Sequence, residues 1–293
     1  MKTKFMLLFL SFQVFAFAQQ GNVLESLTMK SNLLKGEVKY SIYLPPGYNS
    51  SERSYPVLYL LHGYSGNETV YIQFGEINRI VDNVINKGES APLIIIMPDA
   101  KVTWYCNDYL GINPYEDMFI KEFIPFMEKQ YRIRSKKEFR AVAGISMGGY
   151  GALMYAMKYN ELFASCVAFS SGTLTDMEVI NMPDTMYTIM EGIYGKNLKG
   201  DARLSDSWKE HSPLHLAKTI SPDKLRSVRF YIDCGDEDPL YRGNAALHNL
   251  FRELNIPHEY RVRDGDHNWS YWRAGLPAGL SFINKTFVRE AGF

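Results

Sequence analysis

Residues 144–149 (GISMGG) place a serine between glycines where two sequence patterns meet. An apolar run at 139–143 precedes the motif, and a helical pattern begins at Met147. A Gly-x-Ser-x-Gly in this setting forms a tight strand-to-helix turn that lifts the serine hydroxyl clear of the sheet. We therefore predict that Ser146 is a nucleophile and that the N–H of Met147, at the helix N-terminus, is available to a developing oxyanion.

A serine hydroxyl is a poor nucleophile without a base, and the base is expected to be a histidine. In proteins with this turn the chain order is serine, then the acid, then histidine. Five histidines follow the serine: His211, His215, His248, His258 and His267. Only His267 lies just beyond a late strand pattern, in the loop 264–269 (DGDHNW), so we predict it as the general base. The alternative is a surface histidine in a polar turn.

The acid should follow the preceding strand pattern at 228–232. Residues 233–239 (DCGDEDP) hold four acidic side chains at that place. Asp238 lies beyond the glycine turn and before the next helix, which suits a carboxylate that orients an imidazole and stabilises its protonated form. Asp236 remains the alternative. The spacing of these acids does not match a calcium-binding loop, and we predict neither a metal nor an organic cofactor.

A second backbone donor is needed beside that of Met147 to hold an oxyanion. Residues 61–66 (LHGYSG) end an apolar strand pattern, where a sheet of this kind places that donor. We predict the N–H of Tyr64 for this role, and a glycine-rich surface turn is the alternative. Together these residues predict acyl transfer through a covalent serine ester.

Strand patterns alternate with helical patterns, which predicts an α/β fold with a mostly parallel central sheet and helices on both faces. The predicted strands are 37–44, 55–61, 92–97, 139–143, 164–169, 228–232 and 258–262. The predicted helices are 115–131, 147–159, 244–254 and 272–287. The polar stretch 171–222 breaks the alternation, and we predict an insertion that partly covers the site. One ordinary helix with long loops is the alternative.

Residues 1–18 have the pattern of a secretory signal peptide, with two lysines, an apolar run and Ala-Phe-Ala at 16–18. The run is too short to span a bilayer comfortably, and no later segment is long and apolar enough to be a membrane helix. We therefore predict a secreted or periplasmic protein without membrane contact after cleavage, with one catalytic domain over 19–293. A buried N-terminal helix is the alternative.

The 293 residues are 46% hydrophobic and carry a formal net charge of zero, with 32 basic and 32 acidic side chains. This balance argues against nucleic acid as a partner. Three widely spaced cysteines make neither a disulfide framework nor a zinc site. We expect Cys166 and Cys234 to be buried in apolar runs, whereas Cys106 lies in a polar loop and is the one expected to reach solvent.

Six pieces of the chain together resemble the esterase D-like esterases, a group that includes carbohydrate esterase family 1. They are 61–63 (LHG), 104–105 (WY), 115–117 (YED), 144–149 (GISMGG), Gly235-x-x-Asp238 and Gly265-x-His267-x-Trp269-x-x-Trp272, and they span roughly 37–285. The resemblance implies the α/β-hydrolase fold and a catalytic triad of Ser146, Asp238 and His267. It also implies an oxyanion hole made by the N–H groups of Tyr64 and Met147.

Members of this group include feruloyl esterases, acetylxylan esterases, S-formylglutathione hydrolases, short-chain acyl esterases and mycolyltransferases. The signal peptide argues against the formylglutathione enzyme, which works in the cytosol. Hydrolysis of feruloyl or acetyl esters on plant-wall polysaccharide is then the expected function. The alternatives are an acyltransferase, short-chain acyl esterase or lipase with the same triad, an S-formylglutathione hydrolase-like thioesterase, and a non-catalytic binding protein. An aromatic wall for a feruloyl ring or a sugar would come from Trp104, Tyr105, Trp269 and Trp272, unless these are packing residues.

Overall fold

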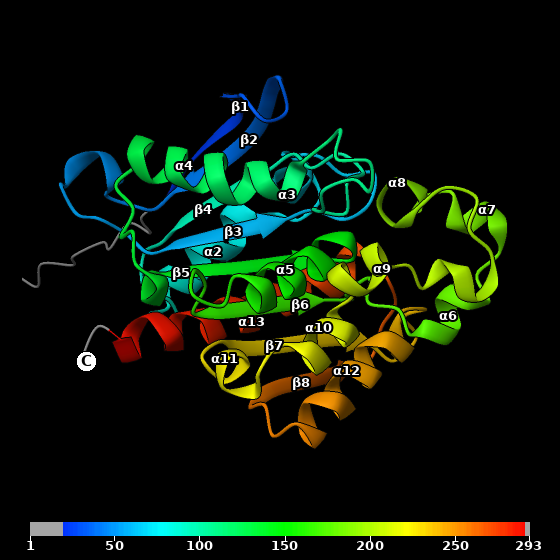
Figure 1. The fold of residues 1–293 in the computed structure, drawn as a ribbon. Helices are drawn as coiled ribbons and strands as arrows, with labels where there is room; N and C mark the ends of the chain where they lie inside the picture. The colour runs from blue at the N-terminus through cyan, green and yellow to red at the C-terminus, as the bar shows by residue number, and fades with distance from the viewer. Residues whose placement is uncertain (1–19, 291–293) are drawn as a thin grey trace, which may run out of the picture.

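The computed structural model describes residues 20–290, so the predicted signal peptide lies outside the described residues. At its centre is an eight-stranded sheet in the order β1-β2-β4-β3-β5-β6-β7-β8 (Figure 1). The six neighbouring strands β4, β3, β5, β6, β7 and β8 run parallel to one another, whereas β2 is antiparallel to both of its neighbours. The strands are β1 Asn22–Ser31, β2 Gly36–Leu44, β3 Val57–Leu61, β4 Ile94–Pro98, β5 Arg140–Ile145, β6 Ser165–Phe169, β7 Arg229–Gly235 and β8 His258–Arg263.

Helices cover both faces of this sheet, which confirms the predicted fold class (Figure 1). One face packs against α3, α4, α5, α10 and α12, and the other packs against α2 and α13. The α-helices are α1 Val70–Gln73, α2 Ile77–Asn86, α3 Tyr115–Met118, α4 Ile124–Gln130, α5 Met147–Lys158, α6 Asp176–Ile180, α7 Asp184–Tyr187, α8 Glu191–Tyr194, α9 Asp206–His211, α10 Pro213–Thr219, α11 Pro222–Arg226, α12 Tyr241–Glu253 and α13 Trp269–Glu290. Helical segments of other types are η1 Tyr48–Ser50, η2 Phe119–Phe123, η3 Lys137–Phe139 and η4 Gly200–Arg203.

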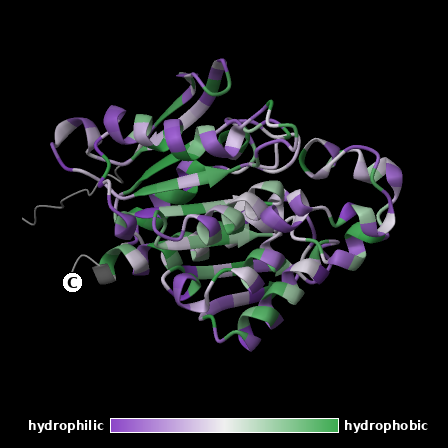
Figure 2. Cartoon of the chain, in the orientation of Figure 1, coloured by the Kyte–Doolittle hydropathy of each residue, from purple (hydrophilic) through white to green (hydrophobic). Residues whose placement is uncertain are grey.

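The strands β3 and β4, in the middle of the sheet, have hydrophobic residues at every position and are buried on both faces. All five residues of β3 and of β4 are buried, and Figure 2 shows the middle of the sheet as its most hydrophobic part. Parallel strands covered on both faces need this kind of sequence. The register pairs Leu61 with Gly144 and Ile145 with Phe169, so the loops that leave β3, β5 and β6 emerge at one edge of the sheet.

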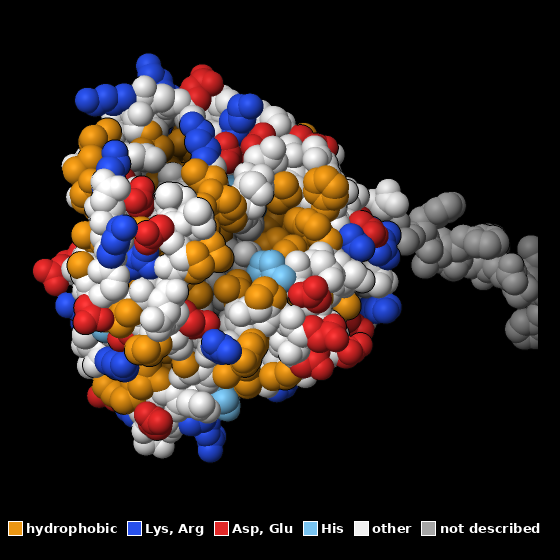
Figure 3. All heavy atoms as spheres, turned by 90° about the vertical axis from the view of Figure 1, so that its right-hand side faces the viewer, with side chains coloured by type: hydrophobic (Ala, Val, Ile, Leu, Met, Phe, Trp, Pro, Cys, Tyr) orange, Lys and Arg blue, Asp and Glu red, His pale blue; other side chains and the backbone are white. Residues whose placement is uncertain are grey.

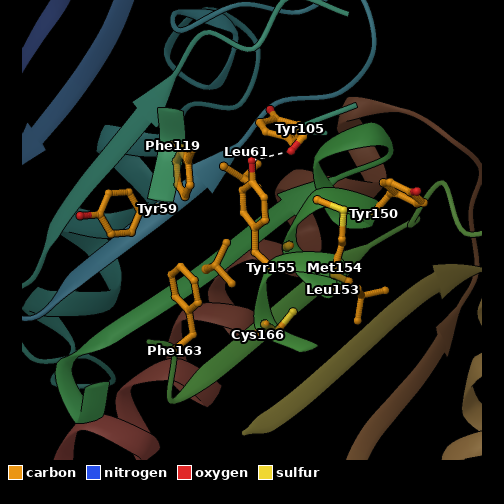
Figure 4. Close-up of a cluster of buried hydrophobic side chains, with 14 of the residues drawn as sticks. Tyr59, Leu61, Tyr105, Phe119, Tyr150, Leu153, Met154, Tyr155, Phe163 and Cys166 are labelled. Atoms are coloured by element: carbon orange, nitrogen blue, oxygen red, sulfur yellow. Dashed lines mark hydrogen bonds between the residues drawn. The ribbon is translucent and has the colours of Figure 1, made fainter. Parts of the chain in front are cut away.

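The predicted helix 115–131 is present, but it is not one uniform α-helix. Its middle turn, η2, is a π-helix between α3 and α4. Within that turn Phe119 stacks on Tyr155 of α5 at 4.8 Å between ring centroids and meets Tyr59 of β3 edge-on at 5.5 Å. Figure 4 shows these three rings in the core between the sheet and α5. Since helical periodicity is read at a fixed 3.6 residues per turn, it does not reveal a single wider turn.

Two features of the fold, the strand β1 and the burial of Cys106, differ from the sequence prediction. The strand β1 lies outside the strand predicted at 37–44, which therefore is not the outer strand. The segment 171–222, for which an insertion is predicted and one ordinary helix with long loops is the alternative, holds several short helices, α6 to α10. The prediction that Cys106 reaches solvent is wrong: its side chain is buried, and its thiol donates to the carbonyl of Trp104. Between residues 20 and 290, no helix combines the length and the apolarity that crossing a membrane requires.

Glu116 of α3 joins three elements in a buried polar cluster. Its carboxylate contacts Nζ of Lys158 at 2.5 Å, the hydroxyl of Tyr159 at 2.6 Å and Nε2 of His211, in α9, at 3.3 Å. Burial alone would raise the pKa of Glu116. The hydrogen bonds and charges of its three partners outweigh that effect and lower the pKa to about 2. The cluster therefore ties α9, which lies within the segment 171–222, to the core helices.

We expect this cluster to make the free energy of unfolding depend on pH. Folding lowers the pKa of Glu116 from 4.5 to about 2. The ionised carboxylate therefore stabilises the folded protein fully above pH 4.5, and this stabilisation is lost as the pH falls toward about 2. This pH-dependent part of the free energy of unfolding, on the order of 3 kcal/mol, should be missing in Glu116→Gln. Urea unfolding of both proteins across that pH range measures it, with the exposed Glu161→Gln as control. Parallel curves for wild type and Glu116→Gln would contradict the prediction.

Candidate active site

The turn between β5 and α5 has the geometry of a nucleophile elbow. Ser146 adopts φ 54° and ψ −120°, a conformation that serine rarely takes. A Cβ on Gly144 would lie 2.3 Å from the backbone of Gly148, and a Cβ on Gly148 would lie 2.1 Å from the carbonyl oxygen of Leu61. Both positions therefore require glycine. Met147 begins α5, so its N–H is one of the helix N-terminal donors without an intrahelical acceptor.

The side chains of Ser146, His267 and Asp238 form one hydrogen-bonded row. Nε2 of His267 lies 2.9 Å from Oγ of Ser146, and Nδ1 lies 2.9 Å from Oδ2 of Asp238. Because a carboxylate only accepts, Nδ1 carries the ring proton in the neutral imidazole, and Nε2 is left to accept the serine proton. The three residues come from the loops after β5, β7 and β8, which meet at one edge of the sheet.

The structure brings Asp238, and not Asp236, to the imidazole. Asp238 is fully buried, and its Oδ1 accepts the N–H of Leu240 at 2.8 Å. Burial alone would raise the pKa of Asp238, but hydrogen bonds from His267, from a serine hydroxyl and from that N–H hold the pKa below its ordinary value. Asp236 is exposed and accepts the N–H of Gly265 at 3.0 Å.

The loop after β3 lies against the nucleophile turn. A Cβ on Gly63 would come within 3.3 Å of Cβ of Ser146, so the peptide that carries the N–H of Tyr64 lies beside the serine. His62 holds this loop, because its Nε2 accepts the N–H of Ala100 at 2.9 Å and its Nδ1 donates to the carbonyl of Gly63 at 2.8 Å. The sequence offered His62 only as part of a motif. Its bracing role depends on Ala100, which is distant in the chain.

A cavity of about 540 Å³ opens over Ser146 and His267. Figure 3 looks onto the carboxyl ends of the strands and shows apolar side chains gathered around a hollow on this face. Among the described residues that line it there is no Lys, Arg, Asp or Glu. The lining consists of Gly63, Tyr64, Ser65, Gly66, Val70, Phe74, Ile145, Ser146, His267, Asn268, Trp269 and Trp272. The cavity is therefore suited to an uncharged, largely apolar group.

Two of the four predicted aromatic residues line this cavity. Trp269 stacks on Phe74 at 6.3 Å between ring centroids and meets Tyr71 edge-on at 5.5 Å. Trp272 stands edge-on to the imidazole of His267 at 5.0 Å. The sequence analysis does not identify Phe74 as a site residue. An exposed aromatic residue in a short helical region indicates no function until its stacking partner, Trp269, is known from the structure.

The other two, Trp104 and Tyr105, do not line the cavity, and their prediction as wall residues is wrong. Tyr105 is fully buried, and its hydroxyl donates to the carbonyl of His62 at 2.9 Å. Trp104 is buried edge-on against Tyr150 at 5.4 Å. Both residues have positive φ, 55° for Trp104 and 63° for Tyr105. They are packing residues, which was the alternative reading.

Solved structures place this architecture among known hydrolases. A structure described as a ferulic acid esterase is 29% identical, with a TM-score of 0.78 over 92% of this chain and 99% of that chain. A fluorophosphonate-binding serine hydrolase of Staphylococcus aureus is 24% identical, with a TM-score of 0.76 over 90% of this chain and 98% of that chain. The fold is therefore the α/β-hydrolase fold, as predicted.

Within residues 20–290, His, Cys, Asp and Glu side chains form no group that would hold a metal ion.

Curated relatives point in the same direction. An esterase of Mycobacterium tuberculosis is 32% identical over 246 residues, which cover 78% of this chain and 52% of that protein. An acetyl esterase of Caldicellulosiruptor saccharolyticus is 27% identical over 230 residues, 78% of this chain and 83% of that protein. The chain thus spans about half the length of the mycobacterial relative. A family model described as "Putative esterase" matches residues 31–283, from the end of β1 into α13. The chain therefore belongs to this esterase family.

Proposed function

We propose that the chain is an exported serine carboxylesterase that hydrolyses acyl esters through a covalent serine intermediate. The observation that carries this proposal is the position of His267, whose two ring nitrogens each lie 2.9 Å from a partner, Oγ of Ser146 and Oδ2 of Asp238. A base in contact with a nucleophile, and oriented by a third group, is the arrangement that nucleophilic catalysis requires. The cavity over Ser146 supplies the space for an ester.

The reaction proceeds in two acyl-transfer steps. His267 takes the proton of Ser146 while the serine oxygen attacks the ester carbonyl, and the N–H groups of Tyr64 and Met147 bind the oxyanion. His267 then gives this proton to the departing alcohol, which leaves an acyl-serine. A water molecule, deprotonated by His267, attacks the acyl-serine, releases the acid and restores the serine. Asp238 stabilises the imidazolium that forms in each step.

The proposed substrates are feruloyl or acetyl esters of plant-wall polysaccharide. The uncharged cavity and its stacked pair, Phe74 and Trp269, favour a planar aromatic acyl group, because such rings gain both apolar burial and ring–ring contact. An acetyl group fits the same space. Similar proteins carry the names acetyl esterase and ferulic acid esterase. No step of this mechanism calls for a metal or an organic cofactor.

Two segments outside the catalytic core complete this proposed function. Residues 1–18 act as a signal peptide that directs the protein to the periplasm or the medium, and 19–293 form one esterase domain. The segment 171–222 is an insertion that partly covers the site. In support of this, α7 and α8 lie beyond the carboxyl ends of the strands, on the side of the molecule where the cavity opens (Figure 1).

The experiment that tests this function compares hydrolysis of methyl ferulate and p-nitrophenyl acetate by residues 19–293 and by its Ser146→Ala variant. We expect both esters to be cleaved, with a kcat/KM for the ferulate at least comparable to that for the acetate, and no activity above background in the variant. Cleavage of the acetate alone would leave the triad in place and make acetylated polysaccharide the substrate. Full activity in Ser146→Ala would refute the mechanism. Adding an alcohol acceptor separates a hydrolase from an acyltransferase, since only a transferase forms new ester in quantity.

A further inference from the structure

The turn 74–76, between α1 and α2, carries one wall of the cavity over Ser146. Phe74 ends α1, where its N–H donates to the carbonyl of Val70 at 2.8 Å, and its exposed ring lines the cavity. Glu76 precedes α2 with φ 50°, a left-handed conformation that is strained for a residue with a Cβ. A strained backbone persists only where its surroundings hold it. The contacts made by this turn therefore decide where the ring of Phe74 lies.

The turn packs directly against Trp269, the first residue of α13. A Cβ on Gly75 would lie 2.6 Å from the carbonyl oxygen of Tyr71 and 3.0 Å from Cζ3 of the Trp269 ring. The ring of Phe74 stacks on the same tryptophan, with 6.3 Å between the ring centroids and 26° between the ring planes. Since both rings line the cavity, they form one aromatic wall that two distant parts of the chain build together.

Arg273 connects the two parts of this wall. It follows Trp269 by four residues in α13, so the two side chains lie on the same side of the helix. Its Nη1 donates to the carbonyl of Phe74 at 2.7 Å, and its Nε lies 3.6 Å from Oε1 of Glu76. Arg273 is not among the described residues that line the cavity. It therefore reaches the wall only through the turn 74–76.

We propose that Arg273 is a positioning residue for acyl-group selectivity, which holds the turn 74–76 against α13 so that Phe74 stays beside Trp269. This inference rests on the proposed function and deepens it. Without the guanidinium the turn loses a charge-assisted hydrogen bond, and the Phe74 ring gains conformational freedom. A planar aromatic acyl group then gains less from ring–ring contact, because binding must first order the ring. An acetyl group has no ring and depends little on this wall.

The test compares p-nitrophenyl cinnamate with p-nitrophenyl acetate, two esters that share their leaving group and differ only in the acyl group. We expect Arg273→Met to lower the ratio of kcat/KM for the cinnamate to kcat/KM for the acetate by about threefold to tenfold, the contribution of one ring–ring contact. Arg79→Met is the matched control and should keep the wild-type ratio, since Arg79 pairs with the other oxygen of Glu76, Oε2, at 2.5 Å. A general loosening of the fold would lower both values of kcat/KM and leave their ratio unchanged.

A double-mutant cycle with Phe74→Ala tests whether Arg273 acts through this ring. Phe74→Ala should lower the ratio at least as far as Arg273→Met, and adding Arg273→Met should lower it no further. A full additional loss, a wild-type ratio in Arg273→Met, or a wild type that cleaves only the acetate would overturn the inference. Should Arg273→Met not fold, Arg273→Lys keeps a cation beside Glu76 without the planar guanidinium, and the same cycle applies.

The same measurements separate this inference from the proposed function. If Ser146→Ala is inactive toward both esters while Arg273→Met keeps the wild-type ratio, only this inference fails and the proposed function stands. Activity of Ser146→Ala toward either ester would instead refute the proposed mechanism.

Discussion

Asp238→Asn is expected to lower kcat for p-nitrophenyl acetate by about 10⁴-fold, with little change in KM. The carboxylate accepts Nδ1–H of His267 at 2.9 Å and so keeps Nε2 unprotonated and directed at Ser146. An amide at this position is able to donate its own N–H to Nδ1. The imidazole then carries its proton on Nε2 and has no lone pair for the serine proton. Steady-state kinetics of the purified variant, with its fold checked by circular dichroism, measures the effect.

Asp236→Asn is the matched control for this substitution. It makes the same chemical change two residues earlier in the same loop, on an exposed carboxylate that bonds the N–H of Gly265 and not the imidazole. We expect its kcat to stay within about twofold of wild type, because surface substitutions away from the reacting atoms have small effects. If Asp236→Asn were the inactive variant instead, the assignment of the acid would have to be reversed.

The residues of the site that could be predicted from the sequence are those that local chemistry restricts. The glycines around Ser146 are required by contacts within a few residues of the turn and with the adjacent strand. The motif 144–149, with a strand pattern before it and a helical pattern after it, therefore identifies the elbow. His267 was found by chain order and by its place beyond the last strand pattern. Among the four acids of 233–239 the pattern gave only a preference, since the acid that reaches the imidazole is decided by how the loop packs.

What the sequence could not predict depends on contacts between distant residues. Tyr105 and Trp269 have similar sequence surroundings, each in a polar stretch with another aromatic residue within two positions. Only the fold turns the first beneath the surface and the second toward the cavity. The same holds for Cys106, which a polar loop brings against Met154 of α5. The strand β1 escaped notice because only Met29 and Ser31 of its ten residues are buried, so it lacks a continuous apolar pattern.

Asp233, near the end of β7, has a structural role beside the site. It is fully buried, and Nε and Nη2 of Arg263, in β8, donate to its carboxylate at 3.1 and 2.9 Å. The hydroxyls of Tyr231 and Tyr271 donate to the same carboxylate at 3.0 and 2.5 Å. This cluster ties β7 and β8 to the first turn of α13, which follows directly on the loop of His267.

Arg263→Met is expected to lower the free energy of unfolding by about 3 kcal/mol, because it leaves a buried carboxylate without its cation. The two tyrosine hydroxyls still donate to Asp233, and the guanidinium is partly exposed. The expected loss of unfolding free energy is therefore at the lower end of the range of about 3–5 kcal/mol for breaking a buried ion pair. Urea unfolding at neutral pH measures the change. Arg261→Met is the matched control on the same strand, since Arg261 pairs with Glu259 at 2.6 Å near the surface, where an ion pair contributes less than about 1 kcal/mol. Equal losses in the two variants would mean that Asp233 does not depend on its cation, and that the two hydroxyls alone hold the start of α13 against the sheet.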